Sequence, residues 1–207
     1  MKSKILILGL VLMLAANSQL NAQYAKQDST YKKCFFGSTL FMLGNFAESN
    51  KPDFAQVNLG YRLTGKDVVS LELKTWKYAW SLGIPYTSKS FEAPKTEFPG
   101  YIREYGFAFA YQRFLWKGLY AGVHVMNAWQ NFVDVGGKKV DNGFQIFNTY
   151  RIGYHFKLFK DRFFIEPSIA VTHRPYHTRM PDSFKQLDDQ WPKYLLGEPG
   201  LHFGYNF

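Results

Sequence analysis

The sequence predicts an all-β chain, in which an eight-stranded antiparallel transmembrane β-barrel follows an N-terminal signal peptide. Eight segments alternate apolar and polar residues with a period of two, which places the two kinds of side chain on opposite faces of a strand. The connections between these segments alternate in length. The last segment is strongly aromatic and ends at the C-terminus, as expected of a strand that has to close a barrel.

The aromatic content supports strands rather than membrane helices. Aromatic residues make up 19% of the chain. After residue 22, however, no apolar run approaches the roughly 20 residues that a membrane-spanning helix needs. So many aromatic side chains without long apolar runs require a structure that places them at every second position.

The first 22 residues have the organisation of a secretory signal peptide. Lys2 and Lys4 form a basic start, residues 5–16 are an apolar run, and residues 17–22 are small or polar. We expect cleavage after Ala22, because the apolar run is too short for a spanning anchor. Three parts follow from this: the signal peptide at 1–22, a periplasmic segment at 23–33 and a barrel at 34–207.

The charge balance says little about partners beyond what export already implies. The chain has 25 basic and 16 acidic residues. Export excludes nucleic acid as a partner, whereas a basic surface could contact anionic lipid headgroups. Ordinary polar loops explain the same balance. Cys34 is the only cysteine, so no internal disulfide can form.

The alternation is clearest in the second segment, where Val57, Leu59 and Tyr61 lie between Gln56, Asn58, Gly60 and Arg62. The same criterion applied along the chain predicts the remaining strands. We expect strands over residues 34–46, 53–63, 69–80, 101–114, 119–133, 143–157, 162–173 and 194–207.

The connections after the second, fourth and sixth strands are about four residues long, and each resembles a tight turn. The other connections are longer, and those at 81–100 and 174–193 approach twenty residues; a Gly- and Lys-rich loop is expected at 134–142. This asymmetry is typical of outer-membrane barrels, which have short periplasmic turns and long external loops. An even number of strands then places both ends of the barrel in the periplasm.

The alternative all-β fold is a soluble barrel with an apolar interior, and the composition of the two faces argues against it. The interior of an eight-stranded barrel is only just wide enough for side chains to fill, so small residues belong inside. They occur in the polar set, at Gly60, Gly106, Ala108, Ala110, Gly122, Gly153, Ala170, Gly200 and Gly204. The apolar set is large throughout and suits lipid. Five tyrosines near strand ends suit interfacial girdles: Tyr61, Tyr105, Tyr111, Tyr154 and Tyr205.

The last strand carries the most specific pattern. Leu201, Phe203, Tyr205 and Phe207 stand at alternate positions up to the terminus. With these residues the chain resembles the small eight-stranded outer-membrane proteins of Gram-negative bacteria, the OmpA and OmpX type. The resemblance implies that the assembly machinery recognises this strand, and that the barrel sits among outer-membrane lipid and lipopolysaccharide. The aromatic content and the sequence Asn21-Ala22-Gln23 are similar to those of uncharacterised Bacteroidetes barrels.

A set of polar residues is expected to project into the lumen. These residues are Glu72, Lys74, Glu104, His124, Arg151, His155, Glu166, Glu198 and His202. The first interpretation is a salt-bridged plug, because an isolated buried charge costs several kcal/mol. The second is a gated conduction path or a proton-sensitive site, because histidine titrates near neutral pH. Two Glu-Pro pairs, at 166–167 and 198–199, predict local bends or bulges, because proline lacks a ladder donor.

Catalytic and metal motifs are weak. Outer-membrane lipid A deacylases use a His-x-Ser pair, which neither His173 nor His177 matches. The same two histidines have a spacing that metal sites use, but they lie in an expected loop, so we expect no metal, cofactor or catalytic residue. The aromatic and charged loops at 81–100 and 174–193 suit an unknown surface partner. Three functions are therefore considered: a plugged envelope protein, a narrow channel for small solutes and a lipid-modifying enzyme.

Overall fold

The structure, a computed structural model, describes residues 32–47, 51–85, 88 and 98–207. The expected signal peptide lies outside the described residues, as do residues 23–31 of the expected periplasmic segment. Much of the connection expected at 81–100 is also outside them. Among the described residues, no helix is long and apolar enough to cross a membrane.

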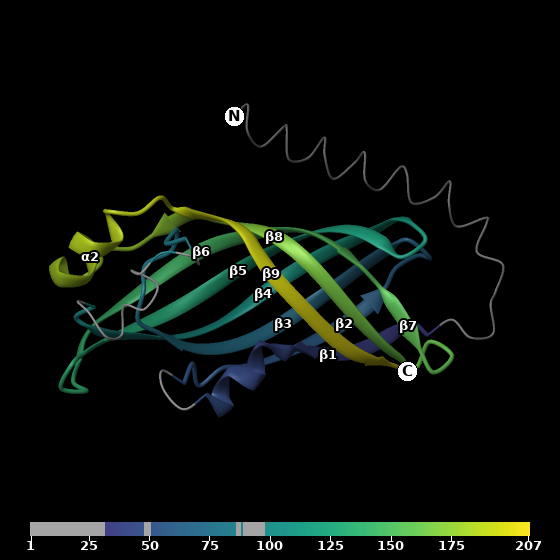
Figure 1. Ribbon diagram of the computed structural model, residues 1–207, viewed down its shortest axis with the longest axis horizontal. Helices are drawn as coiled ribbons and strands as arrows, with labels where there is room; N and C mark the ends of the chain where they lie inside the picture. The colour runs from purple at the N-terminus through teal and green to yellow at the C-terminus, as the bar shows by residue number, and fades with distance from the viewer. Residues whose placement is uncertain (1–31, 48–50, 86–87, 89–97) are drawn as a thin grey trace.

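The described chain forms one antiparallel sheet that closes on itself as a ring of eight strands (Figure 1). Consecutive strands pair with one another, and the first pairs with the last. Nine labels are used because the sixth strand is interrupted at His155 and continues as β7 in the same register against β8. The strands are β1 (Cys34–Thr39), β2 (Ala55–Arg62), β3 (Asp67–Tyr78), β4 (Gly100–Trp116), β5 (Leu119–Asp134), β6 (Lys139–Tyr154), β7 (Phe156–Leu158), β8 (Phe163–His177) and β9 (Tyr194–Asn206).

The two ends of the ring carry different connections (Figure 1). The turn end holds the C-terminus, the start of β1 and the tight connections 63–66 and 117–118. The loop end holds the connection 178–193, which contains the helix α2 (Asp182–Asp188). The tight connections follow the second and fourth strands, and another follows the sixth, as expected. The connection after the fifth strand, expected to be long, is also a tight turn at 135–138, so the alternation in length holds only in part.

The side-chain distribution is the reverse of that in a water-soluble protein. Along β2, Gln56 and Asn58 are buried, whereas Val57 and Leu59 are 48% and 49% exposed. The same alternation runs along β8. The expected apolar exterior is therefore present in the described strands. The interior holds the expected polar residues together with buried apolar ones such as Ile102 and Phe132.

The first strand is shorter than expected. The prediction of a strand over 34–46 is wrong beyond Thr39, where a 3-10 helix, η2 (Leu40–Phe46), begins. The Thr39 hydroxyl accepts a hydrogen bond from the amide of Phe41 and so starts the helix. Four consecutive apolar residues, 40–43, break the period of two, which removes the reason for a strand.

Two expected loops are also partly regular. The loop expected at 134–142 is a tight turn, because β6 begins at Lys139 and pairs with β5 there. The loop expected at 174–193 begins as strand, since β8 runs to His177, and then forms α2. Helix α2 has only seven residues, which is too short to predict from the periodicity of its sequence.

The two Glu-Pro pairs lie at irregularities of the sheet, as expected. Pro167 lies opposite the interruption between β6 and β7, where a proline cannot donate to the ladder. Glu198 and Pro199 directly follow a bulge, at which Gly197 is an extra residue with a φ of +76°. Each proline therefore accompanies a local break in regular pairing.

The ring closes at the seam between β1 and β9. Cys34 and Phe207 exchange backbone hydrogen bonds of 3.2 and 2.9 Å, and register pairs run on to Thr39 and His202. Gly37 faces Gly204 across this seam. A Cβ atom on Gly204 would lie 2.3 Å from the Phe164 ring on β8 and 2.6 Å from the carbonyl oxygen of Phe36 on β1, so both the seam and the interior beside it need a residue without a side chain here.

A methyl group at this seam should weaken closure. We expect Gly204→Ala to lower the unfolding free energy by about 1–3 kcal/mol, the usual cost of overpacking. Gly65→Ala is the matched control, since a Cβ there meets nothing within 4 Å. Denaturant titration of the refolded chain measures both, and equal stabilities for the two variants would show that the seam tolerates a side chain.

Candidate functional site

The interior of the ring has two parts. Near the turn end it is filled by polar and charged pairs, called here the polar plug. Toward the loop end it holds a cavity of about 320 Å³. Among the nine residues predicted to face the lumen, Glu72, His124, His155 and Glu166 belong to the polar plug. The other five, Lys74, Glu104, Arg151, Glu198 and His202, line the cavity.

The polar plug links strands that are not neighbours. Glu72 on β3 lies 2.9 Å from Nδ1 of His124 on β5, with β4 between them. Glu166 on β8 accepts from Nδ1 of His155 at 2.7 Å and from Gln112 on β4 at 3.1 Å. The bonds from Glu72 to His124 and from Gln112 to Glu166 cross strands that are not neighbours, whereas His155 and Glu166 face each other on adjacent strands. Each charge therefore has a partner.

Two aromatic rings hold His155 of the polar plug in place. His155 stacks on Phe164, with ring centroids 5.0 Å apart, and meets the Phe114 ring edge-on at 5.4 Å. A buried imidazole between two rings has little rotational freedom. Its carboxylate partner is therefore fixed as well.

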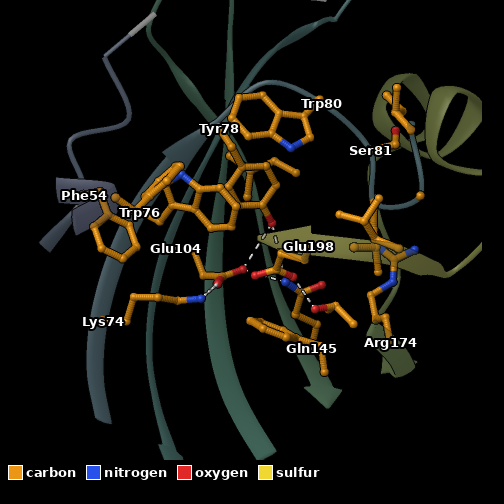
Figure 2. Close-up of a pocket in the computed structure, with 18 of the residues that line it drawn as sticks. Phe54, Lys74, Trp76, Tyr78, Trp80, Ser81, Glu104, Gln145, Arg174 and Glu198 are labelled. Atoms are coloured by element: carbon orange, nitrogen blue, oxygen red, sulfur yellow. Dashed lines mark hydrogen bonds and ion pairs between the residues drawn. The ribbon is translucent and has the colours of Figure 1, made fainter. Parts of the chain in front are cut away.

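The floor of the cavity is polar. Glu104 is only 1% exposed, and its Oε2 accepts hydrogen bonds from Tyr78 (3.1 Å), Gln145 (2.5 Å) and Gln130 (3.4 Å). Figure 2 shows Lys74 reaching toward the other oxygen, Oε1, at 3.8 Å. Three hydrogen bonds and one ion pair thus hold this carboxylate at the base of the cavity.

Arg151 and Glu198 complete the floor. Arg151 donates from Nη1 to the hydroxyl of Ser168 at 2.8 Å, and its Nη2 lies 3.9 Å from Glu198. Glu198 also accepts a hydrogen bond from Thr172, whose hydroxyl lies 3.2 Å from that of Thr149. Cations and anions therefore balance across the floor.

The walls of the cavity are aromatic, which the sequence interpretation missed. Trp76, Tyr78 and Trp80 lie in contact, and the ring of Trp76 meets that of Phe54 edge-on at 6.3 Å (Figure 2). A signal was present in the sequence. The inward positions of Glu72 and Lys74, continued along β3 at every second residue, fall on Trp76 and Tyr78. The cavity therefore pairs an aromatic wall with a charged floor.

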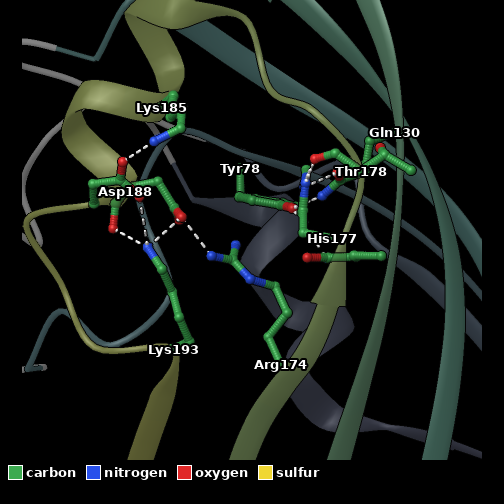
Figure 3. A network of polar contacts seen from close by, with 10 residues as sticks. Tyr78, Gln130, Arg174, His177, Thr178, Lys185, Asp188 and Lys193 are labelled. Carbon is green, nitrogen blue, oxygen red and sulfur yellow. Dashed lines mark hydrogen bonds and ion pairs between the residues drawn. The ribbon is translucent and has the colours of Figure 1, made fainter.

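Helix α2 covers the loop end of the cavity. Phe184 of α2 is 1% exposed and packs on Phe132 and Phe98, with ring centroids 5.0 and 5.3 Å away. Figure 3 shows the polar side of the contact, where Asp188 binds Arg174 and lies 2.5 Å from the ammonium group of Lys193. The loop expected to recognise a surface partner therefore folds back on the ring.

The electrostatics of the exposed face of α2 are local. A hydrogen bond from Lys185 holds the pKa of the Asp189 carboxyl below its usual value. Both groups are half-exposed to water, which screens such pairs, so this bond adds little to the attachment of the helix.

The two histidines with metal-like spacing are separated by the sheet. A bulge in β8 opposite β6 lies between them. His173 faces outward, whereas Nε2 of His177 lies 2.7 Å from Gln130 inside the ring (Figure 3). Within the described parts of the chain, no group of three or more His, Cys, Asp or Glu side chains could hold a metal ion.

No protein-family model, curated protein or solved structure matches this chain. Inferences about function therefore rest on its own residues.

Removing the apolar anchor of α2 should release the helix. We expect Phe184→Ala to lower the free energy of unfolding by about 3–5 kcal/mol, the usual effect of truncating a buried phenylalanine. Proteolysis within residues 178–193 should become faster. Lys185→Ala, on the exposed face of the same helix, should change the rate of proteolysis little. Equal cleavage of both variants would mean that Phe184 does not attach α2 to the ring.

Proposed function

We propose that the chain is an exported outer-membrane β-barrel whose lumen is closed by the polar plug, and that it serves the envelope as a structural or surface-interacting protein. The observation that carries this proposal is the inverted distribution of side chains. Polar residues are buried inside the ring, and large apolar residues are exposed around it.

This distribution is costly in water and favourable in lipid. Soluble monomers rarely expose apolar patches of more than a few hundred Å². Here every strand from β1 to β9 carries at least one exposed large apolar side chain. In a bilayer the same surface is solvated by hydrocarbon, and a closed sheet satisfies its backbone groups internally. Lipid and lipopolysaccharide are accordingly the partners proposed for the outer surface.

The C-terminal strand supports assembly in the outer membrane. Leu201, Phe203 and Phe207 have exposed side chains, and Tyr205 is half-buried between β1 and β8 neighbours. Such a row remains accessible until the barrel inserts. We propose that it is the address read by the assembly machinery, after a signal peptide has directed export.

The polar plug favours a structural barrel over a channel. A conducting path would have to separate Glu72 from His124 or Glu166 from His155, leaving a buried charge unpaired at a cost of several kcal/mol. A narrow channel therefore remains the less favoured function. For a lipid-modifying enzyme, the described residues of the lumen show no hydroxyl hydrogen-bonded to a histidine base: the Ser168 hydroxyl accepts from Arg151 and donates to the carbonyl of Gly200.

The proposal predicts a silent barrel. The chain without residues 1–22, reconstituted in a planar bilayer, should give no steady single-channel steps. A triple variant, Glu72→Ala, His124→Ala and Glu166→Ala, should conduct, because it removes the plug across the ring. Steady steps from the unaltered chain would contradict the plugged lumen and favour the channel.

Assembly gives a second test. Deleting Phe207 removes both the terminal aromatic and its two backbone bonds to Cys34, so outer-membrane levels should fall severalfold. Phe159→Ala is the control, because that side chain is exposed in a turn at the same end. Immunoblots of membrane fractions measure both. Normal levels of the truncated chain would contradict the role of this strand in assembly.

A further inference from the structure

The ring of strands is open on one side toward the loop end. Because β1 has only six residues, it pairs with β9 no further than Thr39 and His202. It pairs with β2 only as far as Gly37 and Asn58. Beyond these points, residues 194–201 of β9 and 55–57 of β2 face each other without a strand between them. This space is called the side opening.

At the base of the side opening, two hydroxyl groups of β1 form hydrogen bonds with the strands on either side. Ser38 donates to the carbonyl of Gln56 on β2 at 2.6 Å, and Thr39 donates to that of Leu201 on β9 at 3.2 Å. The carbonyl of Leu201 thus points toward β1. Because the backbone N–H and C=O groups of successive residues point to opposite sides of a strand, those of residues two apart point the same way. The nitrogen of Pro199 therefore points into the side opening. Proline has no N–H to satisfy there, which suits an unpaired edge.

Helix η2 covers the side opening from one edge only. The Asn45 side chain exchanges two hydrogen bonds with the backbone of Phe54, at 2.7 and 2.8 Å, which attaches η2 to the β2 side. In the described part of the chain, no hydrogen bond joins residues 40–46 to β9. Phe46 of η2 is 84% exposed. The contact between η2 and β9 is therefore the weaker edge of the cover.

The cavity lies directly behind the side opening. Its lining includes Phe41 and Gln56 on one edge, and Leu195, Pro199 and Gly200 on the other. At the loop end it is covered by α2. In lipid, irregular backbone at this depth is tolerated where it lines a cavity. The boundary between η2 and β9 is therefore the part of the wall nearest the cavity that no backbone pairing closes.

Three buried polar atoms of the cavity lining have no hydrogen-bond partner: Oε1 of Glu104, Nε of Arg151 and Nε1 of Trp76. Lys74, at 3.8 Å, gives Glu104 Oε1 a charge partner without a hydrogen bond. An unsatisfied buried group costs about 1–3 kcal/mol, so each such atom is a candidate to bind a polar group of a ligand. The set contains donors and an acceptor, which suits a small group that can both accept and donate.

We propose that the cavity binds a single-chain amphiphile with the chemistry of a fatty acid, which enters sideways from the membrane between η2 and β9. Its hydrocarbon chain packs on Trp76, Phe54 and Phe147, and its carboxyl head, protonated beside the Glu104 carboxylate, donates to Glu104 and accepts from Arg151. The volume, about 320 Å³, lies at the lower end of the range of about 300–1,000 Å³ for ligand cavities, which favours the smaller, single-chain ligand over a two-chain lipid. This inference rests on the proposed membrane location.

The test uses palmitic acid with a photoreactive diazirine on its chain. The chain without residues 1–22 is placed in phosphatidylcholine nanodiscs, irradiated with the probe and mapped by mass spectrometry. We expect saturable labelling of the inward residues Phe54, Trp76 and Phe147. Unlabelled palmitic acid should compete, and lysophosphatidylcholine, with its large head, should not.

A matched pair of variants tests the route. Leu195 lines the cavity, whereas its neighbour Leu196 is 63% exposed on the outer face of β9. Leu195→Trp should weaken inward labelling about tenfold, which corresponds to about 1.4 kcal/mol of binding free energy. Leu196→Trp should leave it unchanged.

The outcomes separate this inference from the proposed function. Labelling confined to outward residues, or inward labelling that neither competitor nor Leu195→Trp reduces, overturns the bound amphiphile while the barrel stands. Equal competition by lysophosphatidylcholine overturns the small head group. A chain that stays out of the nanodiscs overturns the membrane location and this inference together.

Discussion

The pairing of β1 with β9 closes the sheet, and the other features of the molecule depend on it. Where the two strands pair, from Phe35 with Asn206 to Thr39 with His202, closure satisfies their backbone groups and fixes which face of the neighbouring strands points inward. A ring of eight strands leaves little interior space, so only small residues and paired polar ones fit. Gly37 and Gly204 meet at the seam for the same reason.

The short length of β1 gives the two halves of the interior different properties. Near the turn end the ring is complete, and the polar plug ties its walls together through Glu72 and Glu166. Toward the loop end β1 is replaced by η2, the wall opens, and aromatic side chains surround a cavity. In the proposed function, the plug closes the lumen to ions. In the further proposal, the side opening admits a membrane amphiphile to the cavity without passage through the plug.

The sequence predicted the strands and their faces because a period of two is a local property, readable from neighbours such as Val57 and Gln56. It named nine polar residues for the lumen, but not Gln130, Gln145 or Arg174, which are also buried there. It did not predict η2 or α2, since both are short and depend on tertiary contacts, such as Asn45 with Phe54 and Phe184 with Phe132. The cavity arises where β1 ends early, and that depends on contacts across the ring that no single segment reveals.

The central claim is that the exposed apolar face meets lipid, and one substitution tests it most directly. Phe109 lies outward in the middle of β4, whereas Val135 lies in a turn at the loop end; both are exposed. In phospholipid vesicles, Phe109→Arg should lower the unfolding free energy by about 2–4 kcal/mol, the cost of an arginine at mid-membrane. Val135→Arg should change it little. If the two arginines are tolerated equally, the outer face does not contact lipid, and the account is wrong.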